Sequence, residues 1–240
     1  MLTGNKLKII ACLTMLIDHI GLFLFPEALW LRYIGRIAFP LFAFFIAEGC
    51  RYTRDRFRYF LNVFVLAVLC QSVYFVEMLI NGIPDRLYLN VLFTFSISIV
   101  VCSLFFKLKA SVENRACAST VIINAELFAL SIVFSYILSY ALENAFAVSL
   151  RIEYGFFGVI LPLFAAFFKN RYLRLLSFAV GVVLFCFDQS LLASFAWFAL
   201  IAVPIIALYS GSRGSKQLKY AFYLFYPVQF GVLYIISALI

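Results

Sequence analysis

The sequence predicts an all-α membrane protein, a polytopic bundle of about nine transmembrane helices with its N-terminus in the cytoplasm. The first observation is composition: 66% of the 240 residues are hydrophobic, 12% are charged, and the mean hydropathy is +1.07. A soluble domain of this length needs more charged surface, whereas helices that face lipid need almost none. The second observation is that loops rich in lysine and arginine alternate along the chain with loops that contain few of these residues. We expect one integral membrane domain over residues 1–240, because no repeat, low-complexity segment or soluble domain interrupts the apolar segments.

The first apolar segment, residues 7–25, is predicted to be a retained helix. Asp18 and His19 interrupt it and no small-residue cleavage site follows it, which is unlike a signal peptide. Polar breaks delimit eight further segments, namely 31–49, 59–80, 89–106, 116–141, 154–168, 172–187, 190–209 and 220–239. Several of these are short or adjoin their neighbours, so eight or ten helices are alternatives to nine.

The basic residues indicate the orientation. With a cytoplasmic N-terminus, 15 of the 19 lysines and arginines fall on the cytoplasmic side, as the positive-inside rule requires. They are Lys6, Lys8, Arg51, Arg54, Arg56, Arg58, Lys107, Lys109, Arg115, Lys169, Arg171, Arg174, Arg213, Lys216 and Lys219. The other 4 are Arg32, Arg36, Arg86 and Arg151. Because topology explains the net charge of +8, the sequence does not indicate nucleic-acid binding, and we expect the cytoplasmic (inner) membrane as the location.

Cysteine spacing and short motifs exclude several classes of site. The cysteines show no C-x-x-C or other ligand spacing and most lie in apolar segments, so we expect neither disulfides nor a metal site. These residues are Cys12, Cys50, Cys70, Cys102, Cys117 and Cys186. The motifs of P-loop nucleotide hydrolases, serine hydrolases and zinc proteases are absent from the sequence as well.

Polar side chains are predicted to share one layer inside the membrane. A rise of about 1.5 Å per residue places His19 about 16 Å from Lys8, and Arg36 about 20 Å from Gly49, in antiparallel helices. The same rise places three more polar residues about 13 to 18 Å from the cytoplasmic side, namely Gln71, Glu126 and Gln229. A charge at that depth is costly unless it has a partner, so Asp18 and His19 are a candidate functional site.

The partners within this layer have two possible assignments. Adjacent helical positions point about 100° apart, so Asp18 does not orient the ring of His19. We expect Glu126 to orient His19 and Asp18 to pair with Arg36, although the opposite assignment fits the depths nearly as well. Simple structural roles are the alternatives: a buried ion pair for Arg36 and Asp18, and interhelical hydrogen bonds for the two glutamines. Glu126 has the further alternative of facing the headgroup region.

A second polar set lies at the predicted cytoplasmic face. It contains Lys8, Glu48 and a run of arginines, Arg51, Arg54, Arg56 and Arg58. The run is typical of an anchor to anionic lipid. It also suits a dock for a polyanionic cytosolic ligand such as a nucleotide-bearing acyl carrier, and we favour that role for Arg51 and Arg54.

Four stretches give the chain a family resemblance. They are "MLIDHIG", "IGRIAFPLFAFFIAEG" followed by "RYTRDRFRYF", "LNVLFTF", and "FYLFYPVQF". In this order and spacing the chain resembles the TraX family of membrane acetyltransferases, named for the conjugation protein that acetylates the N-terminus of pilin. The resemblance covers essentially the whole chain and is most specific over residues 8–62. The spacing of Lys8 and His19 is also similar to that in type 3 membrane acyltransferases.

The resemblance implies transfer of an acetyl group from cytosolic acetyl-CoA to an acceptor amine or hydroxyl, on a protein, glycan or lipid. His19 would be the general base, a role that suits a lone imidazole with a pKa near ~6.5. Arg36 would stabilise the oxyanion, with Asp18 and Glu126 completing the catalytic set. Lys8, Glu48, Arg51 and Arg54 would hold the CoA, and Gln71, Tyr226 and Gln229 the acceptor. The family's last motif often reads Tyr-Pro-x-His, and Gln229 takes the place of that histidine.

Two other classes of function remain open at this point. A small proton-coupled transporter could use Asp18, His19, Arg36 and Glu126 as a midplane site. The sequence shows neither inverted repeats nor matched helix breaks, which disfavours this class. A non-catalytic assembly scaffold predicts that alanine is tolerated at every polar residue of the layer.

Overall fold

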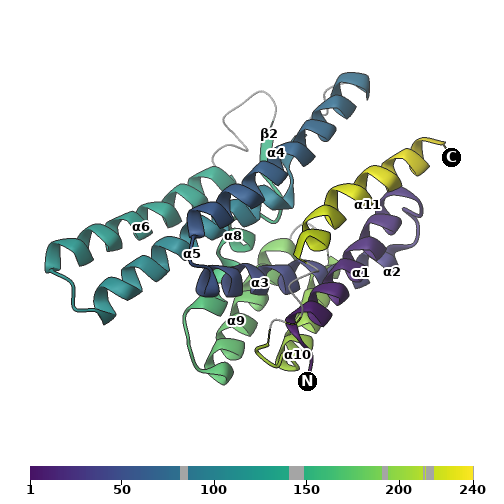
Figure 1. Cartoon of the computed structure of the whole chain (residues 1–240). Helices are drawn as coiled ribbons and strands as arrows, with labels where there is room; N and C mark the ends of the chain where they lie inside the picture. Colours follow the sequence, from purple (N-terminus) through teal and green to yellow (C-terminus); the bar gives the residue numbers. More distant parts are fainter. Residues whose placement is uncertain (82–85, 141–148, 191–193, 213, 215–218, 240) are drawn as a thin grey trace. The chain divides into compact units, whose positions relative to one another are not determined.

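The computed structural model describes residues 1–81, 86–140, 149–190, 194–212, 214 and 219–239, and nearly all of these are helical (Figure 1). The helices are α1 (Gly4–Phe23), α2 (Leu29–Gly35), α3 (Ala38–Tyr52), α4 (Arg56–Asn81), α5 (Val91–Glu113), α6 (Ala118–Tyr140), α8 (Gly155–Ala166), α9 (Arg171–Ser190), the 3₁₀ helix η1 (Ser194–Ile201), α10 (Ala202–Ala207) and α11 (Lys219–Leu239). All nine predicted segments correspond to helices. The second is divided into α2 and α3, and the eighth into η1 and α10; residues 141 and 191–193 lie outside the described residues.

Within the described residues, five helical segments are long and apolar enough to cross a membrane. They are Leu29–Tyr52, Arg56–Phe75, Val91–Glu113, Ala118–Tyr140 and Arg171–Gln189. Three shorter apolar helices accompany them, Gly155–Ala166, Phe195–Ala207 and Leu224–Ser237. Long exposed apolar helices are stable only where lipid replaces water, so these segments indicate a membrane protein. The cytoplasmic N-terminus stays a prediction.

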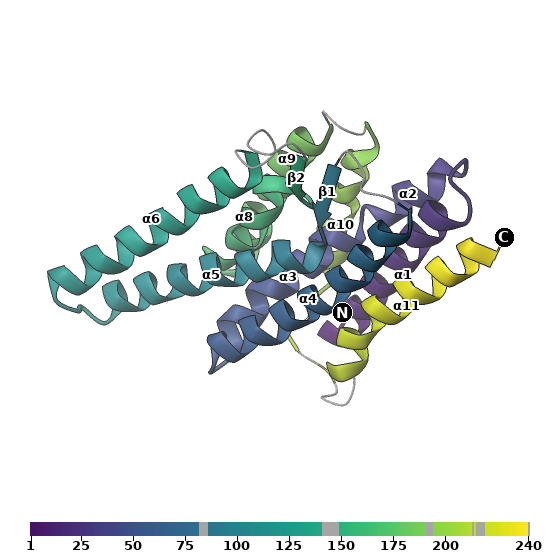
Figure 2. The same ribbon diagram turned by 90° about the horizontal axis from the view of Figure 1, so that it is seen from above.

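The chain divides into two compact units, and the division falls within α3. Unit 1 contains residues 1–44 and 170–240, and unit 2 contains residues 45–169. In unit 1, α1 packs against both α2 and α11, which lie beside it in both views (Figure 2). The start of the chain is bound to the segment after α10, because Leu2 N donates to Leu208 O at 2.8 Å and Ser210 N donates to Leu2 O at 2.9 Å. The predicted single domain stays a prediction.

Two glycines allow α1 and α2 to approach closely. A Cβ atom on Gly35 would overlap the side chain of Asp18, and one on Gly21 would lie 2.7 Å from the Cβ of Leu31. Small residues at helix interfaces are the usual means of close packing in membranes, where no hydrophobic effect drives helices together. Gly35 therefore lets α2 bring its polar side chains to Asp18.

Unit 2 contains a short parallel sheet that the all-α prediction missed. Strands β1 (Arg86–Leu89) and β2 (Ser149–Ile152) pair in parallel, with Leu87 opposite Leu150. Except for Leu89, which begins the predicted segment 89–106, both lie between predicted helices, where the sequence shows no long β pattern. Two hydroxyl groups of α5 donate hydrogen bonds to the segment that follows β2. Thr94 Oγ1 donates to Glu153 O at 2.6 Å, and Ser98 Oγ donates to Val159 O at 2.7 Å. These bonds join α5 to α8.

Candidate functional site

Asp18 is the centre of an ion-pair cluster, here called the Asp18 cluster, that also contains Arg32 and Arg36. Arg32 Nη1 donates to the Asp18 carboxylate at 2.7 Å and to its backbone carbonyl at 2.9 Å. Arg36 Nη2 donates to both carboxylate oxygens, at 3.0 and 3.2 Å. The expected pairing of Asp18 with Arg36 is confirmed. Arg32 was missed, although its position one helical turn before Arg36 places both arginines on one face of α2.

The Asp18 cluster holds one negative and two positive charges. Only 7% of Asp18 is exposed, and the two arginine side chains are 20% and 16% exposed. The guanidinium of Arg36 also lies over the ring of Phe195, 5.3 Å from its centre. One carboxylate cannot balance two guanidinium groups, so this part of α2 carries a net positive charge inside an apolar unit. Such a charge favours a developing anion nearby.

His19 faces a different helix from Asp18. Its Nδ1 lies 3.0 Å from Nε2 of Gln229 on α11. Three aromatic rings surround the imidazole at centroid distances of 5.8 to 6.2 Å, namely Phe23, Tyr226 and Phe230. The 100° between adjacent helical positions explains why α1 directs Asp18 to α2 and His19 to α11.

Gln229 contacts the His19 ring within unit 1, whereas the orienting role expected of Glu126 stays a prediction. Glu126 is exposed on α6 in unit 2, on a helix whose outer face carries exposed apolar side chains such as Ile123 and Leu127. The depth in the membrane that the sequence predicts could not distinguish Gln229 from Glu126 as the contact of His19, because depth contains no information about the direction in which a side chain points. The residue that replaces the family's histidine is thus the one in contact with the candidate base.

Gln71 lies in unit 2, and both the oxygen and the nitrogen of its amide make hydrogen bonds. Nε2 donates to Tyr88 O at 2.9 Å, and Oε1 accepts from the backbone and side-chain nitrogens of Asn90, both at 3.0 Å. Gln71 is 5% exposed, so these bonds satisfy a buried amide. The contacts join α4 to β1 and to the start of α5, and the role expected of Gln71 in binding the acceptor stays a prediction.

The predicted CoA-binding residues have different surroundings. Arg51 Nη2 donates to the carbonyls of Ala165, Ala166 and Phe168, at 3.1, 3.2 and 3.0 Å, and so caps the C-terminal end of α8. Arg54 is exposed in the loop after α3, and Glu48 is buried on α3. The capping role of Arg51 was missed, because no local pattern relates it to a helix more than 100 residues away.

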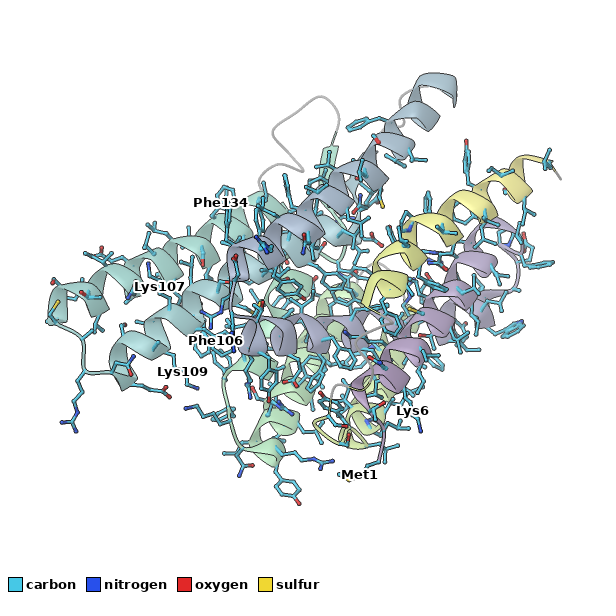
Figure 3. All side chains as sticks on the ribbon, viewed as in Figure 1. Met1, Lys6, Phe106, Lys107, Lys109 and Phe134 are labelled. Atoms are coloured by element: carbon cyan, nitrogen blue, oxygen red, sulfur yellow. The ribbon has the colours of Figure 1, made fainter. Side chains whose placement is uncertain are left out.

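Basic side chains also gather at the ends of other helices (Figure 3). In unit 1, the ammonium group of Lys8 lies 5.6 Å from the ring centre of Phe222, one turn before Tyr226 on α11. In unit 2, Lys107 and Lys109 extend from the last turns of α5, and Lys109 Nζ donates to Phe167 O at 3.0 Å. Within the described residues, no group of three or more His, Cys, Asp or Glu side chains could hold a metal ion.

The fold and these contacts define a mainly helical protein with a polar site inside unit 1, and its long apolar helices indicate a membrane protein. The TraX protein family matches residues 3–237, and the chain belongs to this family. It is 28% identical to the "Probable fimbrial assembly protein FimC, serogroup H1" of Dichelobacter nodosus, over 95% of the chain and 93% of that relative. It is 32% identical to the uncharacterized protein RP591 of Rickettsia prowazekii (strain Madrid E), over 42% of the chain and 40% of that relative. No solved structure matches the chain.

Proposed function

We propose that this protein is an acetyltransferase of the cytoplasmic membrane that moves an acetyl group from cytosolic acetyl-CoA to an acceptor amine or hydroxyl. The observation that supports it is the contact between His19 and Gln229 beside the Asp18 cluster. Acetyl transfer to an amine or alcohol needs a base to remove a proton and a positive charge to stabilise the oxyanion. His19 is the base, and Arg36 is the candidate for the positive charge.

The orientation of the Gln229 amide decides which nitrogen of His19 can act. If Oε1 accepts a hydrogen bond from Nδ1–H, the other ring nitrogen keeps its lone pair and can remove a proton. If the amide NH₂ donates to Nδ1, the other nitrogen carries the proton and cannot act as a base. Gln229 is 7% exposed, and its Oε1 has no hydrogen-bond partner among the described residues when Nε2 faces the ring. We assign the active state to the orientation in which Oε1 faces Nδ1–H.

The acceptor that we propose is the amine of a pilin-like protein. The relative from Dichelobacter nodosus carries the name of a fimbrial assembly protein, and it aligns with nearly the whole chain. Hydroxyl groups of a glycan or lipid are the alternative acceptor. The amine and the hydroxyl make the same demand on His19, because each must lose a proton as it attacks the thioester carbonyl.

The test is acetyl transfer by the purified protein in lipid nanodiscs, with labelled acetyl-CoA and a peptide that carries a free α-amino group. A general base contributes about 10² to 10⁴ in rate, so His19→Ala should slow transfer by at least about 100-fold. A peptide with a blocked α-amino group and a glycan acceptor distinguish the amine from the hydroxyl. Transfer by His19→Ala at the wild-type rate would exclude His19 as the base.

The variant Gln229→Leu tests whether Gln229 orients the ring of His19, while it leaves the base itself in place. Without this contact the ring of His19 is no longer held in one orientation. We expect kcat to fall by about 10-fold to 100-fold, because small misplacements of a reacting group have effects of that size. The KM for acetyl-CoA should stay constant, since Gln229 orients the base and binds no donor phosphate. Val228→Ala is the matched control on α11, because Val228 is 59% exposed and adjacent helical positions point about 100° apart. Equal kcat in Gln229→Leu and the control would remove the orienting role.

A further inference from the structure

Arg32 binds the residue that precedes the candidate base. Its Nη1 atom donates to the carboxylate of Asp18 at 2.7 Å and to the backbone carbonyl of Asp18 at 2.9 Å. That carbonyl belongs to the peptide group that links Asp18 to His19, and a peptide group is planar. The contact with Arg32 therefore restrains the backbone from which the His19 side chain extends, as well as the carboxylate next to it.

The restraint acts near the end of α1. The helix ends at Phe23, four residues after His19, and the last carbonyls of a helix have no partner within it. Helix ends fray for this reason. A side chain of α2 that binds α1 at Asp18 therefore holds the last turn of α1, which begins at His19, in a fixed place.

The side chain of Arg32 lies beside α1 as it reaches Asp18. A Cβ atom on Gly21 would lie 3.4 Å from Cδ of Arg32, so the stem of the arginine passes this glycine. Within the described residues, every hydrogen bond of the Arg32 side chain goes to Asp18. The bond to the carboxylate joins two charged groups, and such bonds are about twice as strong as neutral ones. The contact is thus both close and specific.

His19 is held by a second helix through its ring. Gln229 on α11 lies 3.0 Å from Nδ1 of the imidazole, whereas Arg32 on α2 binds the peptide group before His19. The ring can stay against the Gln229 amide only if its own backbone stays in place. The two contacts therefore depend on each other, although they come from different helices.

We propose that Arg32 is a positioning residue for acetyl transfer. By binding both the carboxylate and the carbonyl of Asp18, it fixes the end of α1, so that His19 keeps one orientation against Gln229. The role in transfer rests on the proposed function, whereas the orientation of His19 can be measured without any reaction. Arg36 donates to both carboxylate oxygens of Asp18, so the carboxylate stays paired when Arg32 is replaced, and we expect such a variant to fold.

The experiment uses the fact that His19 is the only histidine in the sequence. The full chain, labelled with ¹⁵N-histidine in lipid nanodiscs, gives NMR signals from one imidazole, and these show which ring nitrogen carries the proton. Arg32→Met removes the donors and keeps an apolar stem. We expect one tautomer in the wild type and a mixture of both in Arg32→Met. We also expect kcat for acetyl transfer to fall by about 10-fold to 100-fold, with the KM for acetyl-CoA unchanged.

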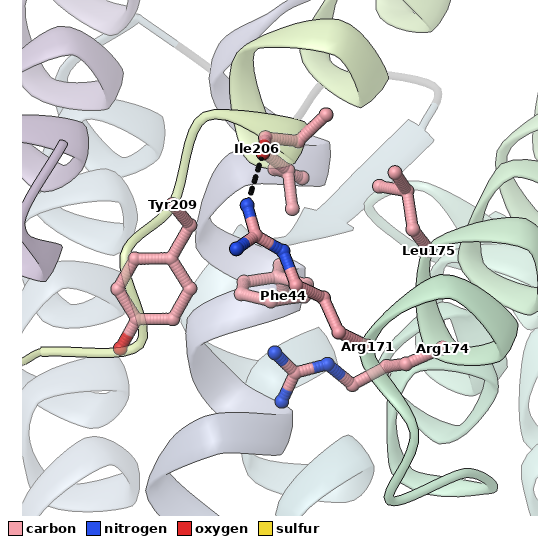
Figure 4. Close-up of a pocket in the computed structure, with 7 residues that line it drawn as sticks. Phe44, Arg171, Arg174, Leu175, Ile206 and Tyr209 are labelled. Atoms are coloured by element: carbon pink, nitrogen blue, oxygen red, sulfur yellow. Dashed lines mark hydrogen bonds between the residues drawn. The ribbon is translucent and has the colours of Figure 1, made fainter. Parts of the chain in front are cut away.

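Arg171→Met is the matched control in the same unit. Arg171 Nη2 donates to a backbone carbonyl, as Arg32 does, because it binds Ala207 O at 2.6 Å at the end of α10 (Figure 4). The substitution therefore removes the same kind of contact, but one that involves neither α1 nor α11. We expect the control to keep the wild-type tautomer of His19 and the wild-type kcat.

The two measurements separate positioning from a purely structural role, which would lower stability and leave the tautomer and the kcat of the folded protein unchanged. A wild-type spectrum of Arg32→Met would overturn the proposal, and so would a mixture of tautomers with a wild-type kcat. If the wild type transfers no acetyl group, the proposed function fails, and the tautomers alone decide whether Arg32 orients His19. Arg32→Gln, which has a shorter side chain without charge, replaces Arg32→Met if the latter does not fold, with the same expected results.

Discussion

At the scale of single residues, Asp18 is the buried carboxylate that pairs with two partly exposed arginines. Asp18→Asn removes the carboxylate that the guanidinium groups of Arg32 and Arg36 share. Removing one partner of a buried ion pair costs about 3 to 5 kcal/mol, and we expect the low end, because the arginines are partly exposed. The free energy of unfolding of the purified protein in detergent is the measurement.

Asp55→Asn is the control for Asp18→Asn. Asp55 is exposed and its carboxylate lies 4.0 Å from Arg58, a surface pair of little value. Its other oxygen accepts from Arg58 N at 2.8 Å and caps α4, a role that asparagine fills equally well. We expect Asp55→Asn to change the free energy of unfolding by less than about 0.5 kcal/mol. Equal losses in the two variants would show that the Asp18 cluster adds nothing to stability.

Cys117, in the loop between α5 and α6, is expected to react as a thiolate at neutral pH. Hydrogen bonds from Ser119 Oγ and Thr120 Oγ1 lower the pKa of the Cys117 thiol to about 7 from 9.0. The thiolate is the nucleophile, so alkylation should accelerate as the pH rises through 7 and level off above it. Rates of iodoacetamide labelling between pH 5 and 10 provide the measurement. Ser119→Ala with Thr120→Val should move the midpoint upward toward pH 9.0, and an unmoved midpoint would contradict the assignment.

At the scale of elements, the packing of α1 against α2 depends on Gly35. Gly35→Ala places a methyl group on the Asp18 side chain and should lower the free energy of unfolding by about 2 kcal/mol or more, the usual cost of overpacking. Gly231→Ala on α11 is the control, because nothing lies within 4 Å of its added Cβ. Alanine should raise stability there by up to about 1 kcal/mol through helix propensity. Thermal unfolding in detergent compares the two, and a Gly35→Ala variant as stable as Gly231→Ala would refute the close approach.

At the scale of the whole molecule, the orientation in the membrane can be measured with the exposed Cys117. The loop that contains it also contains Arg115 and follows Lys107 and Lys109, so charge asymmetry predicts that it is cytoplasmic. A membrane-impermeant maleimide should label Cys117 in inverted vesicles and leave it unlabelled in intact cells. Glu27→Cys, in a Cys117→Ser background, should show the opposite pattern, because Glu27 is exposed in the loop between α1 and α2. Labelling of Cys117 in intact cells would show that the orientation in the membrane is the reverse of the predicted one.

Much of this protein could be predicted from the sequence alone. The helical segments follow from apolar stretches bounded by polar residues, because in lipid a backbone must satisfy its own hydrogen bonds. The TraX family follows from motifs in fixed order, and the family match over residues 3–237 confirms it. The pairing of Asp18 with Arg36 could be predicted because antiparallel helices place equal depths side by side.

Only the tertiary structure decided in which direction each side chain points, and which segments far apart in the chain contact one another. Depth alone could not choose Gln229 over Glu126 as the contact of His19, because it does not say which neighbour a helical face meets. Likewise, Arg51 meets α8 and Arg171 meets the end of α10 through carbonyls that become acceptors only once those helices end beside them. The strands β1 and β2 pair only after their flanking helices have packed, since four residues each carry too little local preference to form a sheet.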